Sequence, residues 1–130
     1  MRWTCPSCDR EFGRAHASHV CVPGISVDDV FAGKPSYMRE VYNEVVTHLR
    51  SSGPVHEDAV RVGVFLKAER KVCEVRPLVR LVKLHLMLPR PVEGAVQVSA
   101  RTWWLQRSLT CAPVPPDVLA LLDEAYDGAS

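Results

Sequence analysis

The spacing of apolar residues changes twice along this 130-residue chain, and these changes constrain the fold more than any other feature. Before residue 50, apolar side chains recur every three or four positions, which predicts a helix with one apolar face. From about residue 60 to residue 111, apolar and polar residues alternate, as in half-buried strands. Helical spacing returns after Asp117. The order helix, strands, helix predicts an α+β domain over residues 25–130, with helices packed on an antiparallel sheet.

The sequence also predicts where these elements begin and end. The first helix is expected to follow a capping box formed by Ser26 and Asp29, and to stop near Gly33. The apolar stripe of the next helix consists of Met38, Val41, Tyr42, Val45 and Leu49. Three to five strands are expected, at about residues 60–67, 71–75, 79–88, 96–104 and 105–111. Arg76-Pro77 should interrupt the second strand because proline donates no ladder hydrogen bond, and Gly128 should end the last helix.

A cluster of cysteines and histidines precedes this domain, in residues 1–24. Cys5 and Cys8 are separated by two residues, and His19 and Cys21 by one. Tetrahedral zinc takes four such ligands in structural sites, so the sequence predicts a small zinc finger that holds one zinc ion. His19 and Cys21 both face the metal if the backbone is extended there. His16 is the rival ligand, because His16 and His19 lie on one face of a helix and would leave Cys21 free.

The rest of the chain suggests a reducing compartment. No stretch approaches the roughly 20 uncharged apolar residues that span a bilayer, and no apolar segment typical of a signal peptide follows Met1. We therefore expect a cytoplasmic protein without a membrane segment. Cys73 and Cys111 stand apart from the cluster in apolar surroundings, and we expect both to be buried free thiols.

The charges are distributed unevenly. Residues 61–110 carry ten basic and three acidic side chains, whereas residues 22–60 and 111–130 have net charges of −3 and −4. One interpretation is that the basic residues solvate the sheet and the acidic helices neutralise them. The other is a basic sheet face that binds the phosphates of DNA or RNA, with Trp103 or Trp104 as a stacking surface. The candidate residues are Arg76, Arg80, Lys83, Arg90, Arg101 and Trp103. Arg80 and Lys83 are an odd number of positions apart, so on one regular strand they would face opposite sides.

Two other functions compete with nucleic-acid binding. The first is a protein–protein adaptor in which the zinc finger docks a partner protein. The second is a metal-dependent nuclease, in which Asp58 and Glu69 would hold Mg²⁺ and Lys71 would orient the attacking water. This acid-x-Lys pattern is weak, because it arises readily by chance. The chain has no glycine-rich phosphate loop and no Ser/His or Cys/His pair at a catalytic spacing, so we expect a non-catalytic protein.

Short motifs in a fixed order also resemble a known family. They are Cys5-Pro-x-Cys8 with Arg10 and Phe12, His19-x-Cys21, Phe31-Ala-Gly-Lys34-Pro, Gly53-Pro-Val, Val64-Phe-Leu-Lys67, Glu74-Val-Arg-Pro77, Leu88-Pro-Arg-Pro91 and Ala125-Tyr126. In this order they resemble the bacterial domain-of-unknown-function family 5655, in members with an N-terminal zinc finger, over essentially the whole chain. The resemblance implies a compact helix-sheet-helix fold, favours Cys21 over His16 as zinc ligand and assigns no activity. Members are fused to restriction and DNA-defence modules, which favours nucleic acid as partner. The chain departs from the family at Arg61-Val62-Gly63, where many members have Lys-Thr-Arg, and at Val72, where an aromatic residue is usual.

Overall fold

The computed structural model describes residues 3–4, 11–13 and 25–129. The first helix, α1 (Val27–Phe31), begins with the predicted capping box. The Ser26 hydroxyl accepts a hydrogen bond from the Asp29 N–H at 3.1 Å, and the Asp29 carboxylate accepts one from the Ser26 N–H at 2.9 Å. These two bonds satisfy N–H groups that the first turn of a helix leaves free.

The second helix, α2 (Ser36–Arg50), buries the predicted apolar stripe against the sheet. The Tyr42 hydroxyl donates a hydrogen bond to the Glu57 carboxylate at the start of the sheet. Burial, together with this carboxylate, raises the pKa of Tyr42 far above its ordinary value, so the phenol stays protonated as a donor. The bond fixes α2 over the first strand of the sheet.

Among the described residues, six strands form one antiparallel sheet in the order β3-β4-β5-β6-β8-β7. The strands are β3 (His56–Val60), β4 (Gly63–Lys67), β5 (Lys71–Pro77), β6 (Val82–Leu88), β7 (Val96–Ser99) and β8 (Thr102–Leu109). A separate two-stranded ladder is formed by β1 (Trp3–Thr4) and β2 (Glu11–Phe12). The α+β class with an antiparallel sheet is therefore confirmed, and the expected maximum of five strands is wrong.

The hairpin of β3 and β4 explains part of this difference. The single strand expected at residues 60–67 is wrong, because Arg61 and Val62 form a tight turn in which Val62 is 53% exposed. Gly63 follows the turn at a point where a Cβ atom would lie 2.6 Å from the Val75 carbonyl oxygen. Only a residue without a side chain fits so close to β5, and this allows the chain to turn there.

The remaining strands also differ from their expected limits. β5 continues through Pro77, which pairs with Val82. The sheet tolerates this proline because it is the last residue of the strand, where the missing N–H removes little of the ladder's hydrogen bonding. β6 begins only at Val82, since the preceding turn is closed by a 2.8 Å hydrogen bond from the Leu78 N–H to the Leu81 carbonyl. The strands expected at 96–104 and 105–111 are instead β7 and β8, which are separated by a turn at Ala100–Arg101.

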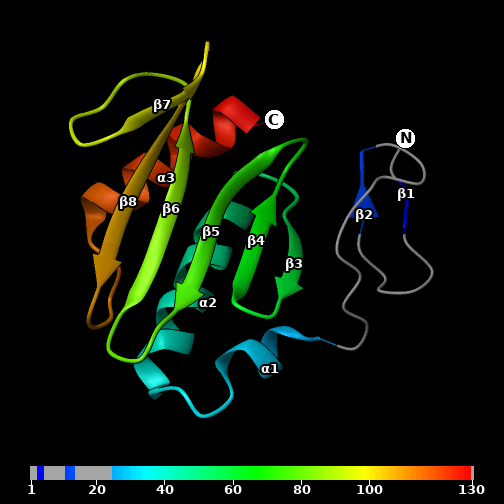
Figure 1. The fold of residues 1–130 in the computed structure, drawn as a ribbon, viewed down its shortest axis with the longest axis vertical. Coiled ribbons are helices and arrows are strands. Elements are labelled where there is room, and N and C mark those ends of the chain that lie inside the picture. Colours follow the sequence, from blue (N-terminus) through cyan, green and yellow to red (C-terminus); the bar gives the residue numbers. More distant parts are fainter. Residues whose placement is uncertain (1–2, 5–10, 14–24, 130) are drawn as a thin grey trace.

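The last helix, α3 (Pro116–Ala129), covers the same side of the sheet as α2 (Figure 1). The expectation that Gly128 ends it is wrong. Gly128 lies inside the helix, where a Cβ atom would be 3.1 Å from the Pro89 ring, so this glycine allows close packing and does not stop the helix. The Tyr126 hydroxyl donates a hydrogen bond to the Pro54 carbonyl at 2.9 Å, and His48 contacts Asp123 at 2.9 Å. These bonds join α3 to α2 and to the loop after it.

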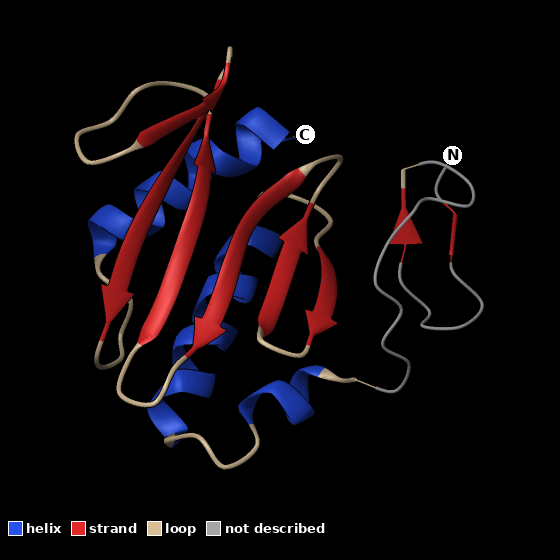
Figure 2. Ribbon diagram, viewed as in Figure 1, coloured by secondary structure: helices blue, strands red, loops and turns tan. Residues whose placement is uncertain are grey.

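The core lies between the helices and one face of the sheet. In the view of Figure 2, α2 and α3 lie behind the sheet and α1 lies below it, and no helix of the described residues covers the front face. Cys73 is fully buried in this core, as expected. Cys111 is exposed, so its expected burial is wrong; it follows the end of β8 and lies outside the sheet. Within the described ranges, no helix is both long enough and apolar enough to cross a membrane.

Candidate functional site

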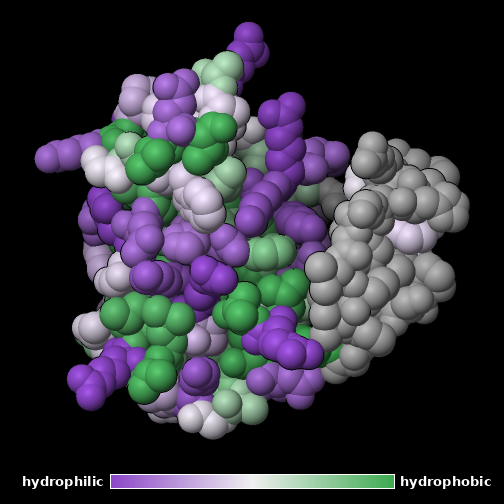
Figure 3. Space-filling view, viewed as in Figure 1, coloured by the Kyte–Doolittle hydropathy of each residue, from purple (hydrophilic) through white to green (hydrophobic). Residues whose placement is uncertain are grey.

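The sheet face opposite α2 and α3 gathers polar, basic and aromatic side chains, and we call it the open face. Side chains alternate along each strand, so residues next to the core-facing Val64, Val75 and Leu84 point to the open face. The open face includes Asp58, Phe65, Lys67, Glu74, Arg76, Lys83, His85, Met87, Trp104, Gln106 and Ser108. Figure 3 shows this face, with hydrophilic side chains in a band across the middle and hydrophobic groups towards its ends.

Buried charges occupy the middle of the open face. Asp58, Glu74 and His85 are only 4%, 7% and 8% exposed. Lys67 Nζ lies 2.9 Å from the Asp58 carboxylate. Glu74 Oε2 lies 3.3 Å from His85 Nδ1 and 3.5 Å from Lys71 Nζ. Each acid is therefore neutralised by a neighbouring base, as burial of a carboxylate requires, and neither presents a free negative charge to a ligand.

Two aromatic rings lie beside these charges. The Lys71 ammonium is 4.2 Å from the centre of the Phe65 ring and 6.0 Å from that of Trp104, which are cation–π distances. His85 meets Trp104 edge to face, with ring centres 4.9 Å apart and an interplanar angle of 86°. Trp104 is nevertheless 37% exposed, so part of its indole is accessible to a ligand.

The end of the open face near the β5–β6 turn is basic. Arg76 on β5 and Lys83 on β6 are register partners, so their side chains project side by side. Within the described part of the chain, neither side chain forms an ion pair. Arg80 is exposed on the adjoining turn, which is fixed by a 2.9 Å hydrogen bond from the Tyr37 hydroxyl to the Arg80 carbonyl. Two of the predicted nucleic-acid-binding residues are thus brought together, with a third at the same end.

The other three predicted residues lie elsewhere. Arg90 binds Glu124 of α3 through two hydrogen bonds, of 2.5 and 3.0 Å. This pair raises the pKa of Arg90 and lowers that of Glu124, so both groups stay charged and their charges cancel. Trp103 pairs with Leu88 and shares the core-facing side of β8 with Leu105, so it is Trp104 that belongs to the open face.

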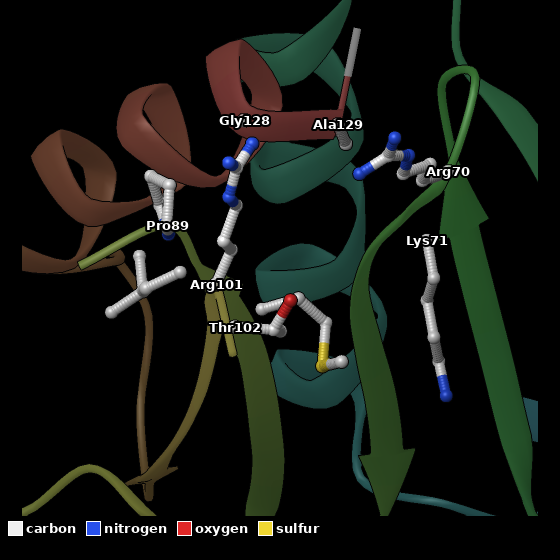
Figure 4. A pocket seen from close by; sticks show the side chains of 9 residues that line it. Arg70, Lys71, Pro89, Arg101, Thr102, Gly128 and Ala129 are labelled. Carbon is white, nitrogen blue, oxygen red and sulfur yellow. The ribbon is translucent and has the colours of Figure 1, made fainter. Parts of the chain in front are cut away.

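Arg101 lines a pocket of about 170 Å³ at the end of α3, together with Arg70 and Thr102. In Figure 4 the guanidinium groups of Arg70 and Arg101 extend towards Gly128 and Ala129, whereas Lys71 points away from them. The last carbonyl groups of a helix carry partial negative charge, which attracts such cations, and the Arg70 N–H donates to the Ala129 carbonyl at 2.9 Å. Both arginines therefore complement the end of α3.

The residues of the nuclease hypothesis do not converge. Asp58 is buried on β3 and bound by Lys67, whereas Glu69 is exposed on the turn between β4 and β5. Lys71 contacts Glu74 and not Glu69. Among the described residues, no three His, Cys, Asp or Glu side chains are grouped as metal ligands. This arrangement offers no assembled magnesium site at the predicted positions.

The predicted zinc ligands Cys5, Cys8, His19 and Cys21, and the rival His16, lie outside the described residues. The structure does describe the ladder that flanks the first two. Thr4 pairs with Glu11 and Trp3 with Phe12, so the two ends of the segment that carries Cys5 and Cys8 lie side by side.

A second pocket, of about 370 Å³, opens on the open face between β6, β8 and β7. It is lined by His85, Gly94, Val96, Trp104 and Gln106. Sequence reasoning missed Glu74, His85 and Gln106. A signal was available for two of them, because Glu74 stands between Cys73 and Val75 and His85 between Leu84 and Leu86, so both face away from the core. Gln106 follows Leu105 but precedes Arg107, so the sequence around it gives no such signal. What the sequence did not show was that the three occupy one row across neighbouring strands.

Comparisons with models of known protein families, with curated proteins and with solved structures found no match. The resemblance to domain-of-unknown-function family 5655 therefore stays a prediction.

Proposed function

We propose that this protein is a non-catalytic module, stabilised by zinc, that binds DNA or RNA through the open face of its sheet. The observation that carries the proposal is the pair Arg76 and Lys83, two adjacent cations without an ion pair in the described residues on a sheet face that no described helix covers. Phosphate groups are the abundant anions that such a surface fits, and contacts to them set the orientation of a strand. Arg80 extends the basic surface at the same end.

The acids of the open face favour this interpretation. Since Asp58 and Glu74 are each paired with a base, they do not repel a polyanion. The exposed charge of the open face is then positive at the Arg76 end, and the aromatic surface of Trp104 lies further along the same face. Basic side chains beside an exposed aromatic ring are typical of surfaces that bind nucleic-acid strands.

The zinc part of the proposal rests on the sequence. Cys5, Cys8, His19 and Cys21 form a complete tetrahedral set, and the pairing of β1 with β2 supports it by bringing the two ends of the Cys5–Cys8 segment together. With four protein ligands such a zinc ion has no open position for substrate. Its role is structural, because metal binding then supplies folding energy to residues 1–24.

A protein adaptor is the second candidate, and one observation favours it. Leu78 and Val79 are 38% and 80% exposed on the β5–β6 turn, and Val62 is 53% exposed on the β3–β4 turn. Exposed apolar groups of this kind mark protein-binding surfaces when they are contiguous. They stand at the same end as Arg76 and Lys83, so the two candidate functions compete for one surface.

The decisive experiment measures binding to fluorescein-labelled DNA and RNA, single-stranded and duplex, by fluorescence anisotropy over a salt series. We expect affinity to fall steeply with salt, because the neutralised phosphates release counterions. Replacing both Arg76 and Lys83 by Gln should weaken binding and reduce the slope of log Kd against log salt by about 1.5 to 2 units, close to one per lost phosphate contact.

Arg90→Gln is the matched control, since it removes one positive charge that Glu124 already neutralises. It should leave affinity and slope unchanged. If Arg90→Gln weakens binding as much as Lys83→Gln does, net charge and not the open face determines affinity. If the wild-type protein binds none of the four polymers at low salt, nucleic-acid binding is excluded and the adaptor becomes the first candidate.

A further inference from the structure

The pocket of about 370 Å³ on the open face has the composition of a site for a flat, polar ring. Val96 and Trp104 are register partners on β7 and β8 and form an apolar side of it. His85 and Gln106 are register partners on β6 and β8 and supply its polar groups. Among the described residues, its lining includes no carboxylate, ammonium or guanidinium group, so a neutral ligand group fits it better than an ion.

The polar groups of the pocket both accept and donate hydrogen bonds. The Gln106 amide has an acceptor oxygen and a donor NH₂ group. His85 Nδ1 lies 3.3 Å from a Glu74 oxygen. An ionised carboxylate only accepts, so the ring proton lies on Nδ1, and in the neutral imidazole Nε2 is then an acceptor. Donors and acceptors beside an aromatic face match the edge and the face of a nucleobase.

The position of the pocket connects it to the basic end of the open face. Trp104 pairs with Met87, which is four residues along β6 from Lys83. At about 3.3 Å per residue, the two levels are about 13 Å apart. One strand can therefore contact both, with phosphates at Arg76 and Lys83 and a base at Trp104. A paired base cannot enter, because its edge is already bonded and its faces are stacked in the duplex.

We propose that this pocket holds one unpaired base of a nucleic-acid strand, stacked on Trp104 and hydrogen-bonded by Gln106. This inference rests on the proposed function and adds to it a preference for single strands. A base–aromatic contact of this kind is sequence-tolerant, since every base has a flat face, so the amide of Gln106 is the group that distinguishes one base from another.

The test compares a labelled single strand with a strand of the same length in which every position is abasic, so that the phosphates are equal and only the bases differ. We expect the wild-type protein to bind the base-containing strand about 5- to 150-fold more tightly, the effect of one stacked base. Trp104→Ala should abolish this difference and leave affinity for the abasic strand and the salt slope unchanged. Trp104→Phe should restore most of it, which a purely structural role would not explain.

Controls separate this inference from the proposed function. Lys83→Gln should weaken binding of both strands equally, and thermal melting should show that each variant is folded. Each strand is tested both as DNA and as RNA. Tighter binding of the RNA strands would show that the 2′-hydroxyl contributes to binding, and equal affinity would show that the pocket accepts bases of either polymer. If the wild-type protein binds both strands equally well, or if Trp104→Ala weakens both alike, the base pocket is excluded while phosphate binding stands. Failure to bind any strand overturns both proposals.

Discussion

Cys73 and Cys111 are in opposite environments, and this difference determines their chemistry. Cys73 is fully buried on β5, where burial raises the pKa of its thiol to about 12, with a further contribution from the nearby Glu74 carboxylate. Only the thiolate is a nucleophile, so this thiol is unreactive while the protein is folded. Cys111 is exposed after the end of β8, so a thiol reagent in solution reaches its sulfur.

Thiol labelling near pH 8 therefore tests the zinc proposal. Of the five cysteines, we expect Cys111 to react fast in the zinc-loaded protein, Cys5, Cys8 and Cys21 to react after a chelator is added, and Cys73 to react only after denaturation. Cys111→Ser should remove the fast phase. His19→Ala should expose the three clustered thiols and His16→Ala should not. Four fast thiols in the zinc-loaded protein would contradict the ligand set.

The pairing of Arg76 with Lys83 shows which features of the candidate site the sequence can predict and which it cannot. Counting positions along one strand placed Arg80 and Lys83 on opposite faces and gave no relation between Arg76 and Lys83. The turn at residues 78–81 interrupts that count. The antiparallel pairing of β5 with β6 then places Arg76 opposite Lys83. Val75 and Leu84 face the core, so their neighbours Arg76 and Lys83 must face away from it. The alternation of side chains within β5 and within β6 predicts these two orientations. Counting the same alternation through the turn between the strands does not predict them.

Whole helices were predicted well, while hairpins were not. The apolar stripe of α2, from Met38 to Leu49, extends over about three turns and identifies the helix by itself. The β3–β4 turn has no such signal, because Arg61 and Val62 are not typical turn residues and Val62 continues the alternation. Only the approach of Gly63 to β5 explains the turn, and that approach involves a strand that lies later in the sequence.

Gly63→Ala tests this explanation. The added Cβ would lie 2.6 Å from the Val75 carbonyl oxygen and 3.1 Å from Arg76 Cγ, so β4 must move away from β5. We expect a loss of about 1–3 kcal/mol in the free energy of unfolding, as for other overpacked positions, measured by chemical denaturation. Gly13→Ala is the control, since a Cβ atom there meets nothing within 4 Å. Equal midpoints for the two variants would show that the hairpin tolerates a side chain at Gly63.

In the molecule as a whole, the side chains that stabilise the fold and those that we propose bind a ligand lie on opposite faces of the sheet. The buried hydrophobic cluster extends from Val30 to Ala129 and lies on the helix side of the sheet. The proposed binding residues lie on the other side. Substitutions at Lys83 or Trp104 therefore alter the open face without removing a core side chain, which makes the binding experiments interpretable.

The same separation predicts the behaviour of a shortened chain. The apolar stripes and alternating strands that predict the α+β domain all lie after residue 24, and among the described residues the buried cluster begins at Val30. Residues 25–130 should therefore fold without residues 1–24 and melt cooperatively, as followed by circular dichroism. Chelation of zinc should change the melting of the full chain but not that of the fragment. An insoluble fragment, or one without a cooperative transition, would show that residues 1–24 contribute to the main core.

The sheet order places β7 at one edge of the sheet. In the described sheet it is an edge strand that pairs only with β8, and all four of its residues are exposed. Local opening of such a strand requires much less free energy than global unfolding, so its amide protons exchange with solvent early. Val96 belongs to this strand and forms one side of the pocket that we propose binds a base. The pocket can therefore widen or close by fraying of one ladder, and its shape adapts to an occupant while the core stays intact.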